Sequence, residues 1–133
     1  MQIPPNIPLY GDPSYRGPCP TETAEALTFF NAIRRTRWGA VAVHVKNEGR
    51  RKHSQAAWEK AHGMVTGAAD IIIPGAPAFV CELKRQDHTK SRISEEQVEY
   101  LEAAQAAGAF ACIALGWEAA MDAVNDWSRI VRQ

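Results

Sequence analysis

The stretch that decides the fold is residues 67–84, which read GAADIIIPGAPAFVCELK. Two apolar, β-prone runs flank a four-residue turn at 74–77, and this pattern predicts a β-hairpin. If the strands pair symmetrically about the turn, Asp70 lies opposite Glu82, with the two Cβ atoms roughly 4.5–5.5 Å apart. Glu82 and Lys84 are two residues apart on one strand and therefore share a face. The hairpin thus predicts two acids and a lysine on one surface.

Two carboxylates so close repel each other, and one pKa rises unless a cation lies between them. A hard divalent ion such as Mg²⁺ suits this place, because its preferred ligands are carboxylates, carbonyl oxygens and waters. An ordinary ion-paired strand is the alternative interpretation of Glu82 and Lys84. That alternative needs only one acid, so the opposed Asp70 favours a metal site.

The order Gly-x-x-Asp, hairpin, Glu-x-Lys resembles the metal site of the PD-(D/E)xK nuclease superfamily. Within that superfamily the chain is similar to the VRR-NUC (virus-type replication-repair nuclease) domain, in its standalone phage form. Further similar segments span residues 21–131: Glu25-x-x-x-Phe29-Phe30, His44-x-x-Asn47-x-Gly49-Arg50, Gln97 with Tyr100, and Gly116-Trp117-Glu118-x-Ala120. One departure is Ala69, where the family usually has a proline before the Asp.

The first helix is predicted to begin after the N-cap Thr21 and to run to about Arg35. Glu25 lies one turn before Phe29, on the apolar side of this helix. The pattern alone leaves open whether Glu25 meets a cation or is a solvated first-turn acid. The resemblance assigns the family's helix acid to Glu25 and not to Glu22.

Gln97 has two possible roles. Ser94-Glu95-Glu96-Gln97 fits the capping box, in which the Gln side chain bonds back to the cap residue. Gln97 also lies one turn before Leu101, on the face directed to the core, and the resembling family has a site Gln here.

The order of elements predicts an α/β domain with a small mixed sheet flanked by helices. We expect a helix at 21–35, a buried strand at 40–45, a short helix at 54–62, the hairpin, a helix from 94 to 108, a strand at 109–115 and a last helix from 116. The continuous apolar run at 109–115 is typical of a strand buried on both faces and parallel to a neighbour. The resemblance implies a restriction-endonuclease-like core.

Length and composition predict one domain at 21–133 behind a proline-rich arm. The chain has 133 residues, and residues 1–20 carry six of its eight prolines, a density that predicts an extended arm. The polar run 85–92 is predicted to be mobile. Cys19, Cys81 and Cys112 lack metal spacing. Cys81 and Cys112 lie in apolar runs and are interpreted as buried thiols, consistent with a reducing cytosol. No stretch has transmembrane length or a signal pattern, so we expect a cytoplasmic protein, in the host cytoplasm if a phage encodes it.

Charge is unevenly distributed although the formal net charge is zero. Residues 34–52 hold seven basic residues and one acid, whereas residues 95–126 hold seven acids and no Lys or Arg. The basic stretch predicts phosphate contacts with DNA, and a solvated loop is the alternative. The predicted DNA-binding residues are Asn47, Arg50, Arg51 and Lys52.

The resemblance implies Mg²⁺-dependent hydrolysis of DNA phosphodiesters, with Mn²⁺ able to substitute. The predicted metal ligands are Glu25, Asp70, Glu82 and the backbone carbonyl of Leu83. Lys84 would orient or help deprotonate the attacking water, and Gln97 would position Lys84 or the water. A homodimer acting on four-way (Holliday) junctions is implied. The alternatives are a flap-directed, end-directed or nicking nuclease, and a non-cleaving DNA-binding or inhibitory protein on the same fold.

Overall fold

A five-stranded mixed sheet lies at the centre of the protein, with strand order β1-β5-β4-β3-β2. The computed structural model describes residues 1–45, 57–58 and 60–132. The strands are β1 (Leu9–Tyr10), β2 (Val43–His44), β3 (Ile71–Ile73), β4 (Phe79–Lys84) and β5 (Phe110–Leu115). The helices are α1 (Glu22–Ile33), α3 (Glu95–Ala106) and α4 (Trp117–Ser128), with a 3₁₀ turn η1 (His88–Lys90). The predicted DNA-binding residues Asn47, Arg50, Arg51 and Lys52 lie outside the described residues.

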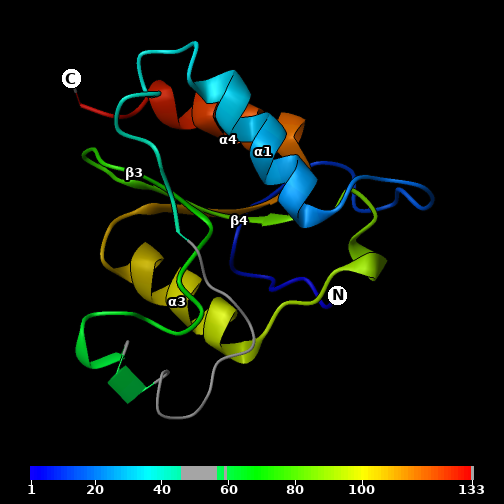
Figure 1. The fold of residues 1–133 in the computed structure, drawn as a ribbon, viewed down its shortest axis with the longest axis horizontal. Helices are drawn as coiled ribbons and strands as arrows, with labels where there is room; N and C mark the ends of the chain where they lie inside the picture. Colours follow the sequence, from blue (N-terminus) through cyan, green and yellow to red (C-terminus); the bar gives the residue numbers. More distant parts are fainter. Residues whose placement is uncertain (46–56, 59, 133) are drawn as a thin grey trace.

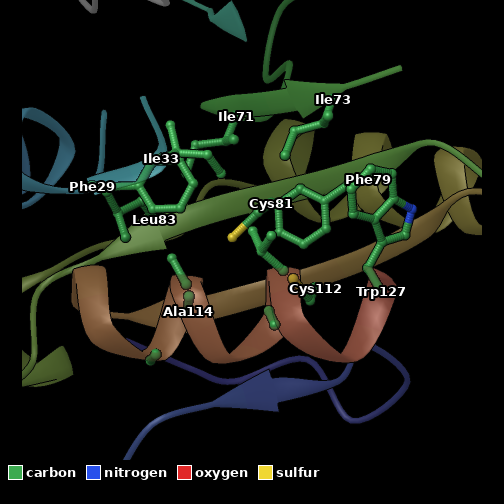
Figure 2. Close-up of a cluster of buried hydrophobic side chains, with 14 of the residues drawn as sticks. Phe29, Ile33, Ile71, Ile73, Phe79, Cys81, Leu83, Cys112, Ala114 and Trp127 are labelled. Carbon is green, nitrogen blue, oxygen red and sulfur yellow. The ribbon is translucent and has the colours of Figure 1, made fainter. Parts of the chain in front are cut away.

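Helices cover both faces of the sheet: α1 and α4 lie on one side and α3 on the other (Figure 1). Alternate residues of β4 point to opposite faces. Phe79, Cys81 and Leu83 join the core beneath α1 and α4, where they pack with Phe29 and Trp127 (Figure 2). The expected α/β architecture is confirmed.

The opposite face of β4 meets α3. Val80 packs there with Leu101 of α3 and with Ile113 of β5. Because side chains alternate along a strand, Glu82 and Lys84 lie on this α3 side of the sheet. The predicted acid and lysine are therefore held on a strand whose six residues are all buried.

The hairpin has the predicted register. Ile71 pairs with Cys81, Ile72 with Val80 and Ile73 with Phe79, so the two residue numbers of each pair sum to 152. A side chain of α4 holds the turn in place, since the Trp127 Nε1 donates to the Pro77 carbonyl at 2.7 Å. β5 is parallel to β4 and is buried along almost its whole length, as its apolar run predicted.

The strand predicted at 40–45 differs from the observed one. Only Val43–His44 form β2, and both residues are exposed. Before them the chain turns, with the Trp38 carbonyl accepting from Val41 N and Ala42 N. β2 lies at the edge of the sheet and, among the described residues, pairs only with β3, so its apolar composition does not lead to burial.

The N-terminal segment is not a free arm. Leu9–Tyr10 form β1, parallel to β5, and Ile113 N donates to the Pro8 carbonyl at 3.0 Å. Ile7 is buried against the α3 face. Prolines are compatible with this position because an edge strand uses the backbone N–H groups of only one side for hydrogen bonds with the sheet. The proline-rich segment therefore packs along the edge of the sheet.

The run 85–92, predicted to be mobile, is instead held by the N-terminal segment. The Arg85 guanidinium donates to the carbonyls of residues 19 and 20. Asp87 caps η1 and accepts from Gly17 N at 3.0 Å, while the Lys90 Nζ donates to the Gly17 carbonyl at 2.9 Å. Sequence polarity did not reveal this, because the partners are about 70 residues away.

Cys81 and Cys112 are buried free thiols, as predicted. In the part of the chain that the structure describes, no helix has the length and apolarity needed to cross a membrane.

Candidate active site

Asp70 stands at the start of β3 and is tied to β4. Its Oδ2 accepts from Leu83 N at 2.9 Å, and its carbonyl accepts from Val45 N at 2.8 Å. The side chain thus takes a backbone donor next to Glu82, where the hairpin register extended by one residue places it. The opposition of Asp70 and Glu82 follows from this geometry.

Glu82 is almost completely buried, with 1% of its surface exposed. Its Oε1 accepts from Gln97 Nε2 at 3.0 Å and lies 3.5 Å from the Lys84 Nζ. Its Oε2 is also buried and has no hydrogen-bond partner among the described residues. A buried carboxylate oxygen without a partner is costly, so this atom marks a place where a proton or a cation would be stabilised.

The pKa of Glu82 lies well above its usual range. Burial is the largest cause, and the negative charge of Asp70 raises the pKa further. The nearby Lys84 lowers it, but by less, and the closeness of the Asp70 carboxyl group and the charge of Glu22 add smaller increases. Two acids that share one proton can hydrogen-bond to each other, whereas two ionised acids need a cation between them.

Lys84 is 2% exposed, and its ammonium group is surrounded by acceptors. Its Nζ donates to the Arg92 carbonyl and to Gln97 Oε1, the latter at 3.3 Å. Glu82 and Glu22 complete the surroundings, with Glu22 Oε1 at 3.8 Å. These contacts fix the position of a long side chain that would otherwise sample many rotamers.

Gln97 has both of the roles that the sequence left as alternatives. Its Oε1 accepts from Ser94 N at 2.9 Å and its own N donates to Ser94 Oγ at 3.1 Å, which completes the capping box. The same side chain contacts Lys84 through Oε1 and Glu82 through Nε2. Capping fixes the amide, and the fixed amide connects the acid and the lysine.

The two acids of α1 have different surroundings from those expected. Glu22, in the first turn, reaches Lys84, and its side chain is 42% exposed. Glu25 is 1% exposed and lies elsewhere: its Oε2 accepts from Trp117 N at 2.8 Å and its Oε1 from Gln86 Nε2 at 3.3 Å. The pattern had left open whether Glu25 is solvated; the structure buries it, and its contacts among the described residues cap α4, whose N-cap Gly116 has no side chain.

Ser91 is a further residue of the cluster that sequence reasoning missed. It is buried, its Oγ donates to Glu22 Oε2 at 3.2 Å, and the same oxygen accepts from Arg85 N at 3.0 Å. It therefore holds Glu22 against the chain that follows Lys84. A serine within a polar run has no sequence signal for this position.

The fold resembles that of a solved structure. The match is to a structure described as a "VRR_NUC domain protein", with a TM-score of 0.71 and 20% sequence identity. It covers 87% of this chain and 93% of the other. The chain has the VRR_NUC fold. The restriction-endonuclease-like core that the resemblance implied is thereby confirmed. No family model and no curated protein matches the sequence.

The site residues of this VRR_NUC fold suit a hard divalent cation by the type of their donor atoms, and their small number leaves coordination positions for water. Asp70 and the unpartnered Glu82 Oε2 are oxygen donors of the kind that Mg²⁺ prefers. Within residues 1–45, 57–58 and 60–132, no group of three or more His, Cys, Asp or Glu side chains is gathered closely enough to hold a metal ion. This sparse set suits Mg²⁺, which commonly uses one or two carboxylates and keeps several waters.

Proposed function

We propose that this protein is a metal-dependent nuclease that hydrolyses phosphodiester bonds in DNA. The observation that carries the proposal is the buried Glu82, which has one oxygen on Gln97 and Lys84 and the other without a partner, beside Asp70. A structural ion pair would need Glu82 and Lys84 alone. The VRR_NUC fold supports the same activity, since the similar structure is described by a nuclease domain.

The proposed site uses Mg²⁺, or Mn²⁺ in its place. Asp70 and Glu82 would hold the ion, with the Leu83 carbonyl as a further oxygen. When bound, the ion would polarise a phosphoryl oxygen and lower the pKa of a water. Of the two α1 acids, the contacts favour Glu22 over Glu25 as the additional acid, because Glu22 Oε1 lies 3.8 Å from the Lys84 Nζ whereas Glu25 accepts from Trp117 N.

Lys84 and Gln97 supply the remaining chemistry of the proposal. The Lys84 ammonium is held beside Glu82, where it would orient the attacking water and offset negative charge that develops on the phosphate. The Gln97 amide, restrained by Ser94, would keep Lys84 and Glu82 in register during the reaction. Fixed donors of this kind need no reorganisation at the moment of reaction.

For the substrate we propose branched DNA, with the four-way junction cut by a homodimer as the first candidate. The sequence has basic residues at 50–52, whose positive charge would suit contacts with DNA phosphates. A flap-directed or nicking enzyme would use the same chemistry but would bind a different DNA structure.

The deciding experiment is cleavage of labelled four-way, flapped, nicked and linear DNAs with Mg²⁺, with Mn²⁺ and with EDTA. We expect cleavage in either metal, none in EDTA and none by the Glu82→Gln variant. Cleavage that persists in EDTA or in that variant would overturn the proposed chemistry. Light scattering on the same samples tests the dimer, and a monomer that cuts one strand of each junction would favour nicking.

A further inference from the structure

An exposed aromatic platform precedes the active-site hairpin. Residues 57–58 and 60–66 are all exposed, and Trp58 is 63% exposed. Its ring stacks on His62, with centroids 4.1 Å apart and planes 29° from parallel. The stack is held because His62 Nδ1 donates to the Trp58 carbonyl at 2.8 Å. A tryptophan fixed in this way yet open to solvent is unusual, because Trp is highly buried on average.

A hollow of about 560 Å³ lies beside this segment, against α3. Its walls are partly apolar and partly charged. The lining includes Lys60, Met64, Val65, Glu96, Glu99 and Tyr100. Met64 and Val65 are exposed apolar side chains on this wall, at 37% and 55%.

The aromatic platform, formed by Trp58 and His62, is linked to the active site through Gly67, whose backbone is closely packed against α3. Gly67 has φ +81°, and a Cβ built there would lie 2.4 Å from the Glu96 carbonyl carbon and 2.7 Å from Gln97 N. The chain is therefore pressed against the start of α3, beside the residue that bonds Glu82. Asp70 follows three residues later, so the platform and the proposed metal site share one short segment. In Figure 1 the green chain leading to β3 runs past α3 after an outlying turn.

We propose that Trp58 stacks on an unpaired base of the DNA substrate, and that the hollow between residues 60–66 and α3 receives the base of the neighbouring nucleotide. The inference rests on the proposed nuclease function and, among the branched DNAs proposed as substrates, favours those with an unpaired nucleotide, such as flaps, over the fully paired four-way junction. A base in a continuous duplex is stacked on both faces, whereas an unpaired base at a branch or gap offers a free face to an aromatic ring.

The charges around the hollow favour a base inside it and a phosphate outside it. Glu96 and Glu99 on the α3 wall disfavour a phosphate in the hollow, but their carboxylates can accept from the exocyclic amino groups of bases. Lys60, on the same segment as Trp58, supplies a cation for the adjoining phosphate. The competing occupant is a second copy of this chain, for which the apolar residues Trp58, Met64 and Val65 would form an interface.

The test compares two DNAs of equal length, one fully paired and one with an unpaired 2-aminopurine at a branch, bound in EDTA by the full chain. Trp58→Ala should weaken binding of the branched DNA roughly tenfold and leave duplex binding unchanged, because one base–aromatic stack is lost. Trp58→Phe should retain most of the affinity. Quenching of 2-aminopurine fluorescence should occur with wild type and disappear in Trp58→Ala.

Leu27→Ala is the matched control, since Leu27 is 64% exposed on α1 and lies outside the platform. Equal weakening on both DNAs, or no weakening by Trp58→Ala, would overturn the platform while the nuclease proposal stands. A change of oligomeric state in Trp58→Ala, seen by light scattering, would assign the surface to a second copy instead. Wild type that stacks 2-aminopurine but cleaves no DNA in Mg²⁺ or Mn²⁺ would refute only the nuclease; wild type that binds no DNA would refute both.

Discussion

Gln97 Nε2 donates to Glu82 Oε1 at 3.0 Å, so the capping residue of one helix is also the neighbour of the buried acid. The opposite end of the same amide accepts from Ser94 N and from the Lys84 Nζ. Because a helix cap restrains this side chain, the start of α3 and the end of β4 are coupled through one amide group. The relationship makes the two roles of Gln97 separable by substitution.

Gln97→Glu should separate capping from catalysis. A glutamate keeps the acceptor that a capping box requires, but it removes the N–H donated to Glu82 and adds a negative charge there. We expect a lower melting temperature at neutral pH, because the added charge repels Glu82, and a roughly tenfold to hundredfold loss of cleavage rate, in line with a lost hydrogen bond to a charged group. The converse variant, Ser94→Ala, should cost about 1 kcal/mol of stability and spare most of the activity. Equal effects of both variants on rate would contradict the separation.

Asp70→Asn tests the metal without disturbing the hairpin. Asparagine can still accept from Leu83 N, but it removes the charge that raises the pKa of Glu82. We expect Mg²⁺ or Mn²⁺ to raise the wild-type melting temperature through binding to the folded state, and to leave that of Asp70→Asn unchanged. Without metal the variant should melt at or above the wild-type temperature at neutral pH, since repulsion is relieved. Asp122→Asn, an exposed acid of α4, is the control and should respond to metal like wild type.

Glu22 and Glu25 should respond oppositely to substitution. Glu22→Gln removes a charge near Lys84 from a half-exposed side chain, so activity and the metal-induced stabilisation should fall while stability changes little. Glu25→Ala leaves the first N–H groups of α4 without their buried acceptor and should cost about 1–3 kcal/mol in urea unfolding. Its metal response should persist. A Glu25→Ala variant with full stability and no metal response would return Glu25 to the ligand set.

Gly67→Ala should be strongly destabilising for two reasons that a control can separate. The residue has φ +81°, and a Cβ there would meet the backbone of Glu96 and Gln97. Gly63 has φ +90° but has nothing within 4 Å of a built Cβ among the described residues. We expect Gly63→Ala to cost about 1 kcal/mol for the left-handed backbone, and Gly67→Ala about 2 kcal/mol or more, with activity lost. Equal unfolding free energies would show that the contact with α3 is not tight.

Acid should loosen the anchorage of the N-terminal segment through Asp87. Its hydrogen bonds with Thr89 and with Gly17 N lower its pKa to about 2. An acid whose pKa is depressed by folding stabilises the protein above its unfolded pKa of about 3.9, and this stabilisation is lost as the pH falls toward about 2. The melting temperature of wild type should therefore fall more steeply between pH 5 and pH 2 than that of Asp87→Asn. Glu102→Gln, on the exposed side of α3, should keep the wild-type slope.

What the sequence by itself determined is local. The hairpin register, with Ile71 opposite Cys81, follows from a short turn and a period of two, and it directs Glu82 and Lys84 to one face. The capping box of Ser94 and Gln97 spans three residues and needs no tertiary contact to be recognised. The buried parallel β5 follows from its uninterrupted apolar run.

Only the tertiary structure decided which distant groups meet. Periodicity placed Glu25 on the apolar side of its helix but left open whether it is solvated. Its partner depends on how α1 is placed against β4 and α4, and this placement brings Glu22 to Lys84 and Glu25 to Trp117. In the same way, β1 pairs with a strand about 100 residues away, and Val43 remains exposed at a sheet edge. The physical reason is that a hydrophobic pattern specifies which face of an element is buried, whereas the packing of whole elements determines what that face meets.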